Sequence, residues 1–215
     1  KLVINVGKKL KGRVSVSGSK NVALKALVAC CLTQDEVIIK NVPLISDVFV
    51  MADIIRELGG RVDFKDHEVS VRVRELKSGK IFLDKAAEIR TSFMFLAPLL
   101  GRLGKAVIPN PGGCCIGSRP FDRIIDCLSK MGASIKYNSG DGYFHAKASS
   151  GLKGTSYRFI KNTHTGTETL ILSAVLAKGR TILENAALEP EVDELINLLN
   201  QMGAKIKRER LTHST

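Results

Sequence analysis

The 215-residue sequence contains no tryptophan, three tyrosines and only eight phenylalanines. Proteins that bind single-stranded nucleic acid interleave basic residues with aromatic residues on which the bases stack. The 33 Lys and Arg residues give a net charge of +12, but they are spread along the chain rather than gathered in runs. This combination favours small phosphorylated substrates over nucleic acid as the anionic partner.

The chain also lacks any apolar run of 18 or more residues and any segment typical of a signal peptide, which argues against a membrane partner. None of its five cysteines shows the CxxC spacing of a zinc site, and the vicinal pairs Cys30/Cys31 and Cys114/Cys115 do not resemble a disulfide framework. We therefore expect a cytoplasmic protein with neither a metal nor a cofactor.

Three signals recur in the same order along the chain. The first is a strand that begins with Leu-Lys, at Leu10, Leu76 and Leu152. The second is an apolar helix followed by a short strand that ends near an asparagine, as in "ALKALVACCLTQDEVIIKN". The third is an amphipathic helix stopped by glycine and followed by a strand: "MADIIRELGGRV", "IIDCLSKMGASI" and "LINLLNQMGAKI". Such self-similarity predicts a fold built from three repeated units.

The glycines that stop the amphipathic helices are Gly59, Gly132 and Gly203, and each stands where a helix end favours a left-handed residue. Each unit reads as strand, helix, strand, helix, strand, and "HEVSVRV" and "GYFHAKA" add a further strand. We predict an α/β fold of three βαβαββ repeats with pseudo-threefold symmetry. The repeats span about 10–75, 76–150 and 151–215, and residues 1–19 form an opening strand.

The start of the first helix in each unit is the best candidate for an anion-binding position, because helix N-termini expose unpaired N–H groups and a positive dipole end. The sequences at these starts are "SGSKN", "EIRTS" and "KNTHTGTE". Symmetry would bring them towards one region. The candidate phosphate-binding residues are Lys20, Asn21, Arg90, Lys161, His164, Thr165 and Gly166.

The loop "NPGGCCIGSRP", Asn110 to Pro120, places two cysteines among three glycines and follows them with Arg119. Nearby cations lower the pKa of a thiol, which makes it a proton donor or a nucleophile. The glycines would allow this loop to close over a ligand. We assign the chemical role to Cys114 and interpret Cys115 as a bystander.

The segments "SGSKN", "NVP", "IRTS", "PGGCCIGSRP", "NAALEPE" and "MGAKI" resemble the N-terminal half of the UDP-N-acetylglucosamine 1-carboxyvinyltransferase family, a group of enolpyruvyl transferases. The resemblance runs across essentially the whole chain. It implies one lobe of an inside-out α/β barrel. It also implies transfer of the enolpyruvyl group of phosphoenolpyruvate to the 3-hydroxyl of UDP-N-acetylglucosamine, with release of phosphate, as the first committed step of peptidoglycan precursor synthesis.

The resemblance also implies roles for individual residues. Lys20 and Asn21 would bind phosphoenolpyruvate, Arg90 would contact substrates at the lobe junction, and Cys114 would be the proton donor. The residues that would line the nucleotide site or hold its phosphates are Arg119, Pro120, Phe121, Asp122, Arg123, Lys161, His164, Thr165 and Gly166. Lys20 and Arg119 join Cys114 as the catalytic set.

Family members carry a second lobe that supplies a general-base aspartate and further arginines, so the resemblance implies that such a lobe acts with this chain, in cis or in trans. Residues 1–19 would pack into it. The alternatives are a non-catalytic UDP-sugar-binding or RNA-binding homologue of half length, and a 3-phosphoshikimate enolpyruvyl transferase. The cysteine loop argues against the last of these.

Overall fold

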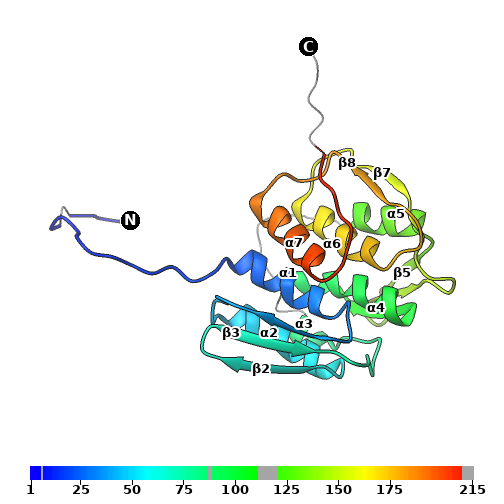
Figure 1. Ribbon diagram of the computed structural model, residues 1–215, viewed down its shortest axis with the longest axis horizontal. Coiled ribbons are helices and arrows are strands. Elements are labelled where there is room, and N and C mark those ends of the chain that lie inside the picture. Colours follow the sequence, from blue (N-terminus) through cyan, green and yellow to red (C-terminus); the bar gives the residue numbers. More distant parts are fainter. Residues whose placement is uncertain (6, 87–88, 111–120, 210–215) are drawn as a thin grey trace, which may run out of the picture.

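Helices α1 (Lys20–Cys30) and α6 (His164–Val175) form the centre of the fold. The computed structural model, which describes residues 1–5, 7–86, 89–110 and 121–209, buries eight consecutive residues in each helix, Ala23–Cys30 and Gly166–Ser173. From Ala23 to Cys30, α1 is apolar on all sides except at Lys25, which is typical of a helix enclosed by other elements. Helix α6 is enclosed as well, although its buried residues include the polar Thr167, Glu168, Thr169 and Ser173. In Figure 1 the two helices lie between the other helices and the sheets.

Helices α2 (Ser46–Glu57), α5 (Asp122–Lys130) and α7 (Pro190–Gln201) each bury one face only. Each ends before a glycine with a left-handed backbone: φ is 101° at Gly59, 94° at Gly132 and 101° at Gly203. These three angles confirm the prediction made from the sequence, since only glycine adopts this conformation without steric cost.

The strands form two sheets of the same design and one smaller pair. The first sheet has the order β1-β3-β2 and the second β4-β6-β5, with antiparallel neighbours throughout, while β7 and β8 pair in parallel. The predicted extra strands are the central β3 and β6. The bounds are β1 Glu36–Ile39, β2 Arg61–Lys65, β3 Glu68–Arg72, β4 Lys105–Pro109, β5 Ser134–Asn138, β6 Tyr143–Lys147, β7 Ser156–Arg158 and β8 Ile182–Glu184; a short helix α3 spans Leu83–Ala86.

The apolar helix expected in the second unit is divided. It begins as a 3-10 helix, η1 (Arg90–Phe95), and continues as α4 (Leu96–Leu103). Pro98 explains the division, because a proline inside one continuous α-helix would clash with the carbonyl four residues earlier, at Met94. With α4 beginning at Leu96, Pro98 falls in the first turn, where its missing N–H costs nothing.

The strand predicted after α7 does not form within the described residues 203–209. The side chain of Asn200 takes the place of a partner strand: its Oδ1 accepts from Ile206 N at 2.8 Å and its Nδ2 donates to Ile206 O at 3.0 Å. Arg208 then donates to Ala187 O at 2.9 Å, which holds the segment against the helix end.

The described residues before α1 form neither helix nor strand and extend away from the body of the protein (Figure 1), so the strand predicted to begin at Leu10 is wrong for this chain, which offers it no partner among its described residues. The strand predicted at Leu76 is reduced to an isolated bridge between Lys80 and Val107. Leu10 is 95% exposed and Val14 is 89% exposed, so their side chains pack against nothing in this chain. Packing of residues 1–19 into a second lobe stays a prediction. Among the described residues, no helix combines the length and apolar character needed to cross a bilayer.

Arg102 ties three separate segments together at the far end of α1. Its guanidinium donates to the carbonyls of Cys31, Thr33 and Arg74 at 3.0, 3.1 and 2.8 Å. We predict that Arg102→Met lowers the free energy of unfolding by roughly 2–4 kcal/mol, because three carbonyls lose a charged donor. Urea titration would measure this.

The matched control is Arg158→Met, since Arg158 is 77% exposed at its side chain and pairs only with Glu184 among the contacts described for it. An exposed pair contributes roughly 0–1 kcal/mol. Equal effects of the two substitutions would contradict the role given to Arg102.

Candidate anion-binding site at the helix starts

Helix α1 presents Lys20 and Asn21 at its start. The cap residue Ser19 makes no side-chain hydrogen bond to the helix, so the first N–H groups of α1 have no side-chain cap. Lys20 forms an ion pair with Asp47 at the start of α2. The amide of Asn21 donates to Glu191 Oε1 of α7 at 3.4 Å. Three helix starts therefore meet at these two residues.

Helix α6 is held at its start by neighbouring loops. Thr163 Oγ1 accepts from Gly166 N at 3.3 Å, Asn162 Nδ2 donates to Ala186 O at 3.2 Å, and Thr167 Oγ1 accepts from Ala187 N at 3.0 Å. A Cβ on residue 166 would overlap the methyl group of Thr163, so glycine is required for this cap. Of the predicted residues here, Lys161 is exposed, His164 and Thr165 are partly buried, and Gly166 is buried.

A buried carboxylate joins the two helices. Glu168 Oε1 lies 3.0 Å from Lys25 Nζ of α1 and 3.1 Å from His164 Nε2. Both contacts lie within ion-pair distance, the second one when His164 is protonated, and neither oxygen of Glu168 accepts a hydrogen bond of standard geometry from a described residue. The carboxylate of Glu168 raises the pKa of His164 above its ordinary value, against the opposing effect of burial.

Arg90 begins η1 and stacks on the ring of Phe121, with its guanidinium carbon 4.3 Å from the ring centroid. Phe121 is the cap residue of α5 and stacks on Phe93, with centroids 3.9 Å apart. Arg123 lies near Tyr157, where its charge opposes the rise of the Tyr157 pKa to about 12 that burial causes. The exposed Asp122 begins α5. Cys114, Cys115, Arg119 and Pro120 lie outside the described residues.

The first turns of the helices divide into two groups. Those of α1, η1 and α6 contain no acidic residue, and each carries a basic one: Lys20, Arg90 and His164. Those of α2, α5 and α7 all contain acidic residues, which complement the helix dipole in the usual way. The three starts selected from the sequence therefore carry no acidic residue in their own first turn, which suits an anion site.

Sequence reasoning missed the acidic partners of these groups, Asp47, Glu191 and Glu168, together with the buried Lys25. A signal was available for two of them: Lys25 stands within "ALKALVACC" and Glu168 within "TETLILS", and a charge inside an apolar helix requires a partner. No group of three or more potential metal ligands occurs in the part of the chain that the structure describes.

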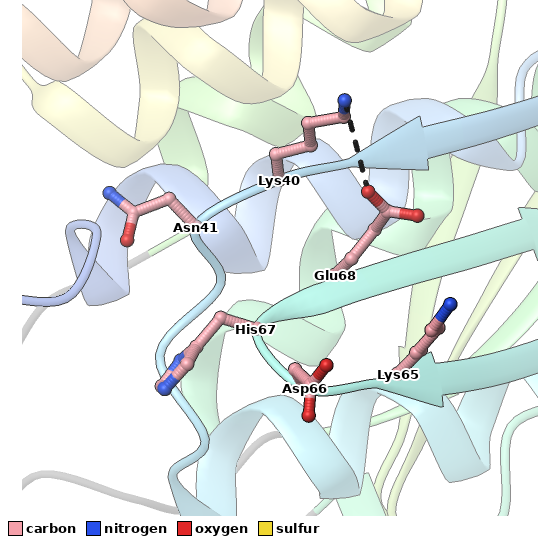
Figure 2. Close-up of a pocket in the computed structure, with 6 residues that line it drawn as sticks. All are labelled: Lys40, Asn41, Lys65, Asp66, His67 and Glu68. Carbon is pink, nitrogen blue, oxygen red and sulfur yellow. Dashed lines mark ion pairs between the residues drawn. The ribbon is translucent and has the colours of Figure 1, made fainter.

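Figure 2 shows a shallow hollow of about 320 Å³ beside the turn between β2 and β3. It is lined by Lys40, Asn41, Lys65, Asp66, His67 and Glu68. None of these is a residue predicted to bind substrate. The lining contains as many carboxylates as lysines, and Lys40 pairs with Glu68, so the hollow is not selectively basic. Its link to the candidate site is Asn41, whose carbonyl accepts from Gly18 N at 3.1 Å.

Burial makes the three described cysteines, Cys30, Cys31 and Cys127, poor nucleophiles. It raises the pKa of Cys31 and of Cys127 to about 12 and that of Cys30 well above its ordinary value. We predict that Ellman's reagent titrates at most two thiols in the folded protein and all five in urea. More than two rapidly reacting thiols in the folded state would contradict this burial.

Comparison with known proteins gives one consistent family. Residues 4–215 match the sequence model of EPSP synthase (3-phosphoshikimate 1-carboxyvinyltransferase). UDP-N-acetylglucosamine 1-carboxyvinyltransferase of Bartonella tribocorum is 42% identical to this chain, and the match covers 97% of this chain and 50% of that protein. The Campylobacter fetus enzyme of the same name is 40% identical, and the match covers 96% of this chain and 49% of that protein. The chain thus spans about half the length of these relatives.

Two solved structures share the fold. The enolpyruvyl transferase NikO from Streptomyces tendae superposes with a TM-score of 0.82 at 22% identity, over 95% of this chain and 48% of its own. EPSP synthase from Acinetobacter baumannii gives a TM-score of 0.69 at 19% identity, and the match covers 92% of this chain and 45% of that one. At these identities the likeness concerns the α/β fold alone.

Proposed function

Because this chain belongs to the EPSP synthase (3-phosphoshikimate 1-carboxyvinyltransferase) family, we propose that it is one lobe of an enzyme that transfers the enolpyruvyl group from phosphoenolpyruvate to UDP-N-acetylglucosamine. The names of the relatives at about 40% identity support this acceptor rather than shikimate 3-phosphate. The observation that carries the proposal is the set of helix starts α1, η1 and α6, which lack acidic residues and bear Lys20, Arg90 and His164.

The lobe would be an inside-out α/β barrel of three βαβαββ units with pseudo-threefold symmetry. The common strand order of the first two sheets and the three left-handed glycines support this arrangement. Residues 1–19 would pair with the second lobe, supplied in cis or in trans.

In this proposal Lys20 and Asn21 bind phosphoenolpyruvate at the start of α1. Lys161 and His164–Gly166 meet the diphosphate of the sugar nucleotide, while Arg90 contacts both substrates. The residues that would complete the nucleotide site are Arg119, Pro120, Phe121, Asp122 and Arg123. Two highly charged anions need several cations, and helix N-termini bind phosphate groups well.

The chemistry requires a proton donor. Cys114 would protonate the methylene carbon of phosphoenolpyruvate while the sugar hydroxyl oxygen adds to its C2. Loss of a proton from that carbon and of phosphate from C2 then restores the double bond. The second lobe would provide the general base. The location would be the cytoplasm, and the reaction would open peptidoglycan precursor synthesis.

Intact-mass spectrometry tests the proposal. The chain would be incubated with phosphoenolpyruvate and UDP-N-acetylglucosamine, with Cys114→Ser and Cys115→Ser as matched variants and shikimate 3-phosphate as the rival acceptor. We expect a covalent phosphoenolpyruvate adduct in the wild type and in Cys115→Ser, and none in Cys114→Ser.

An adduct lost only in Cys115→Ser would reverse the assignment of the two cysteines. Binding of UDP-N-acetylglucosamine with no adduct would indicate a lobe that recognises substrate without carrying out the chemistry alone. Binding of RNA that falls steeply with salt, and no binding of the sugar nucleotide, would replace the proposal with the nucleic-acid alternative.

A further inference from the structure

Lys25 and Glu168 form a buried pair beside His164 that the proposed reaction does not use. The side chain of Glu168 is fully buried and that of Lys25 is 7% exposed, while His164 is 26% exposed. Glu168 Oε2 has no hydrogen-bond partner among the described residues. Buried carboxylates without a donor are uncommon in folded proteins and call for an explanation.

Stability alone does not explain this pair. Taking two charges out of water is costly, and well-packed apolar residues of similar volume often give an equally stable protein. Lys25 lies on a helix whose other residues from Ala23 to Cys30 are apolar, so an apolar side chain would suit its surroundings. A role in specifying the geometry of the site is the better explanation.

The pair and His164 connect the two substrate sites proposed above. Asn21 and Lys25 are four residues apart, so they lie on one face of α1. Asn21 donates to Glu191, whose pKa is lowered first by a hydrogen bond from its own backbone N–H, then by Asn21, and further by the charges of His164 and Lys25. The charged groups that face His164 are Lys25 of α1, Glu168 of α6, and Glu189 and Glu191 at the start of α7.

We propose that Glu168 is a positioning residue for the anion site. Its carboxylate contacts Nε2 of His164 and the ammonium of Lys25. These two contacts fix the starts of α6 and α1 relative to each other. With Nε2 held by Glu168, Nδ1 is the ring nitrogen left to donate to an anion. Lys25 and a protonated His164 supply two positive charges against Glu168, Glu189 and Glu191, whereas a neutral ring leaves Lys25 as the only cation of these five groups. An anion therefore binds best when His164 is charged, and the identity of that anion rests on the proposed function.

The test uses variants that leave no buried charge unpaired. Lys25→Met/Glu168→Gln removes both charges at nearly constant shape, while Lys25→Met alone keeps the carboxylate beside His164. An NMR pH titration of the four histidines gives the midpoint of His164, the pH at which it is half protonated, without any ligand. The variant His164→Asn identifies which signal belongs to His164. We expect the midpoint to be highest in Lys25→Met, intermediate in the wild type and lowest in the double variant.

Calorimetry at pH 7.5 then measures binding of UDP-N-acetylglucosamine and, as a second probe, inorganic diphosphate. We expect the double variant to bind each probe roughly tenfold more weakly than the wild type, the loss expected for one charge-assisted hydrogen bond. At low pH, where His164 is charged in both proteins, the difference should shrink.

An unchanged His164 midpoint in the double variant would overturn the inference, and so would a shifted midpoint with unchanged binding at every pH. A wild type that binds diphosphate but not the sugar nucleotide would refute the proposed function and leave the inference standing. Failure to bind either probe would refute both.

Discussion

Replacing Gly18 with alanine is expected to weaken binding of phosphoenolpyruvate and UDP-N-acetylglucosamine by roughly tenfold or more, with little loss of stability. The N–H of Gly18 donates to Asn41 O at 3.1 Å, and an added Cβ would overlap that same carbonyl oxygen. Asn41 has a left-handed backbone, with φ of 57°, which restricts how far it can move aside.

The chain would therefore move at Gly18, two residues before Lys20. A displacement of about 1 Å in a residue that contacts substrate is enough to reduce activity by about two orders of magnitude. Stability should change by less than about 1 kcal/mol, because the described residues before Gly18 are all exposed. Calorimetric binding and urea titration measure the two quantities separately.

Gly12→Ala is the matched control on the same segment, since a Cβ at Gly12 meets no atom within 4 Å. It should bind both substrates as the wild type does. If Gly18→Ala bound normally, or if Gly12→Ala were equally impaired, the start of α1 would not be the position that governs binding.

Breaking the buried pair of Lys25 and Glu168 from one side should give the largest loss of stability in this protein. Glu168→Gln leaves Lys25 buried without a counter-ion, which is expected to cost about 3–5 kcal/mol. Lys25→Met should cost less, because His164 still balances the carboxylate at 3.1 Å. The double variant should be close to the wild type, so the two effects are far from additive.

Urea titrations of the wild type, both single variants and the double variant complete this cycle at pH 7. The exposed pair of Lys40 and Glu68, which are 4.0 Å apart, is the comparison and should show a coupling below about 1 kcal/mol. Additive costs at Lys25 and Glu168 would contradict the buried ion pair.

The same cycle has a predictable pH dependence. The pKa of His164 is raised in the folded state above its ordinary value of 6.5. The stabilisation from the charged ring is therefore fully present below about pH 6.5 and is lost as the pH rises through the raised pKa. The stability difference between the wild type and His164→Asn should shrink accordingly at alkaline pH.

Sequence reasoning was reliable where structure depends on neighbouring residues. The helices ending before Gly59, Gly132 and Gly203 follow from apolar periodicity and the left-handed residue that follows, both of which are local. The helix starts at Lys20, Arg90 and His164 were also predicted from local residues, while their role in anion binding stays a prediction.

It was unreliable where the outcome depends on distant residues. The pairing of Lys25 with Glu168 and of Asn21 with Glu191 joins the two ends of the chain, and spacing gives no indication of either. The strand expected after α7 was wrong because a local pattern cannot show whether a partner strand exists, and Asn200 binds that segment instead.

The pairing of α1 with α7 also has a consequence for the order in which the protein folds during its synthesis. Asn21 and Glu191 are 170 residues apart, so α1 leaves the ribosome long before α7 exists. At about 5–20 residues per second, that interval is roughly 10 to 30 s. Throughout that interval α1, which is buried from Ala23 to Cys30 in the finished fold, has no partner from α7. The first third of the nascent chain is therefore the segment most in need of a chaperone.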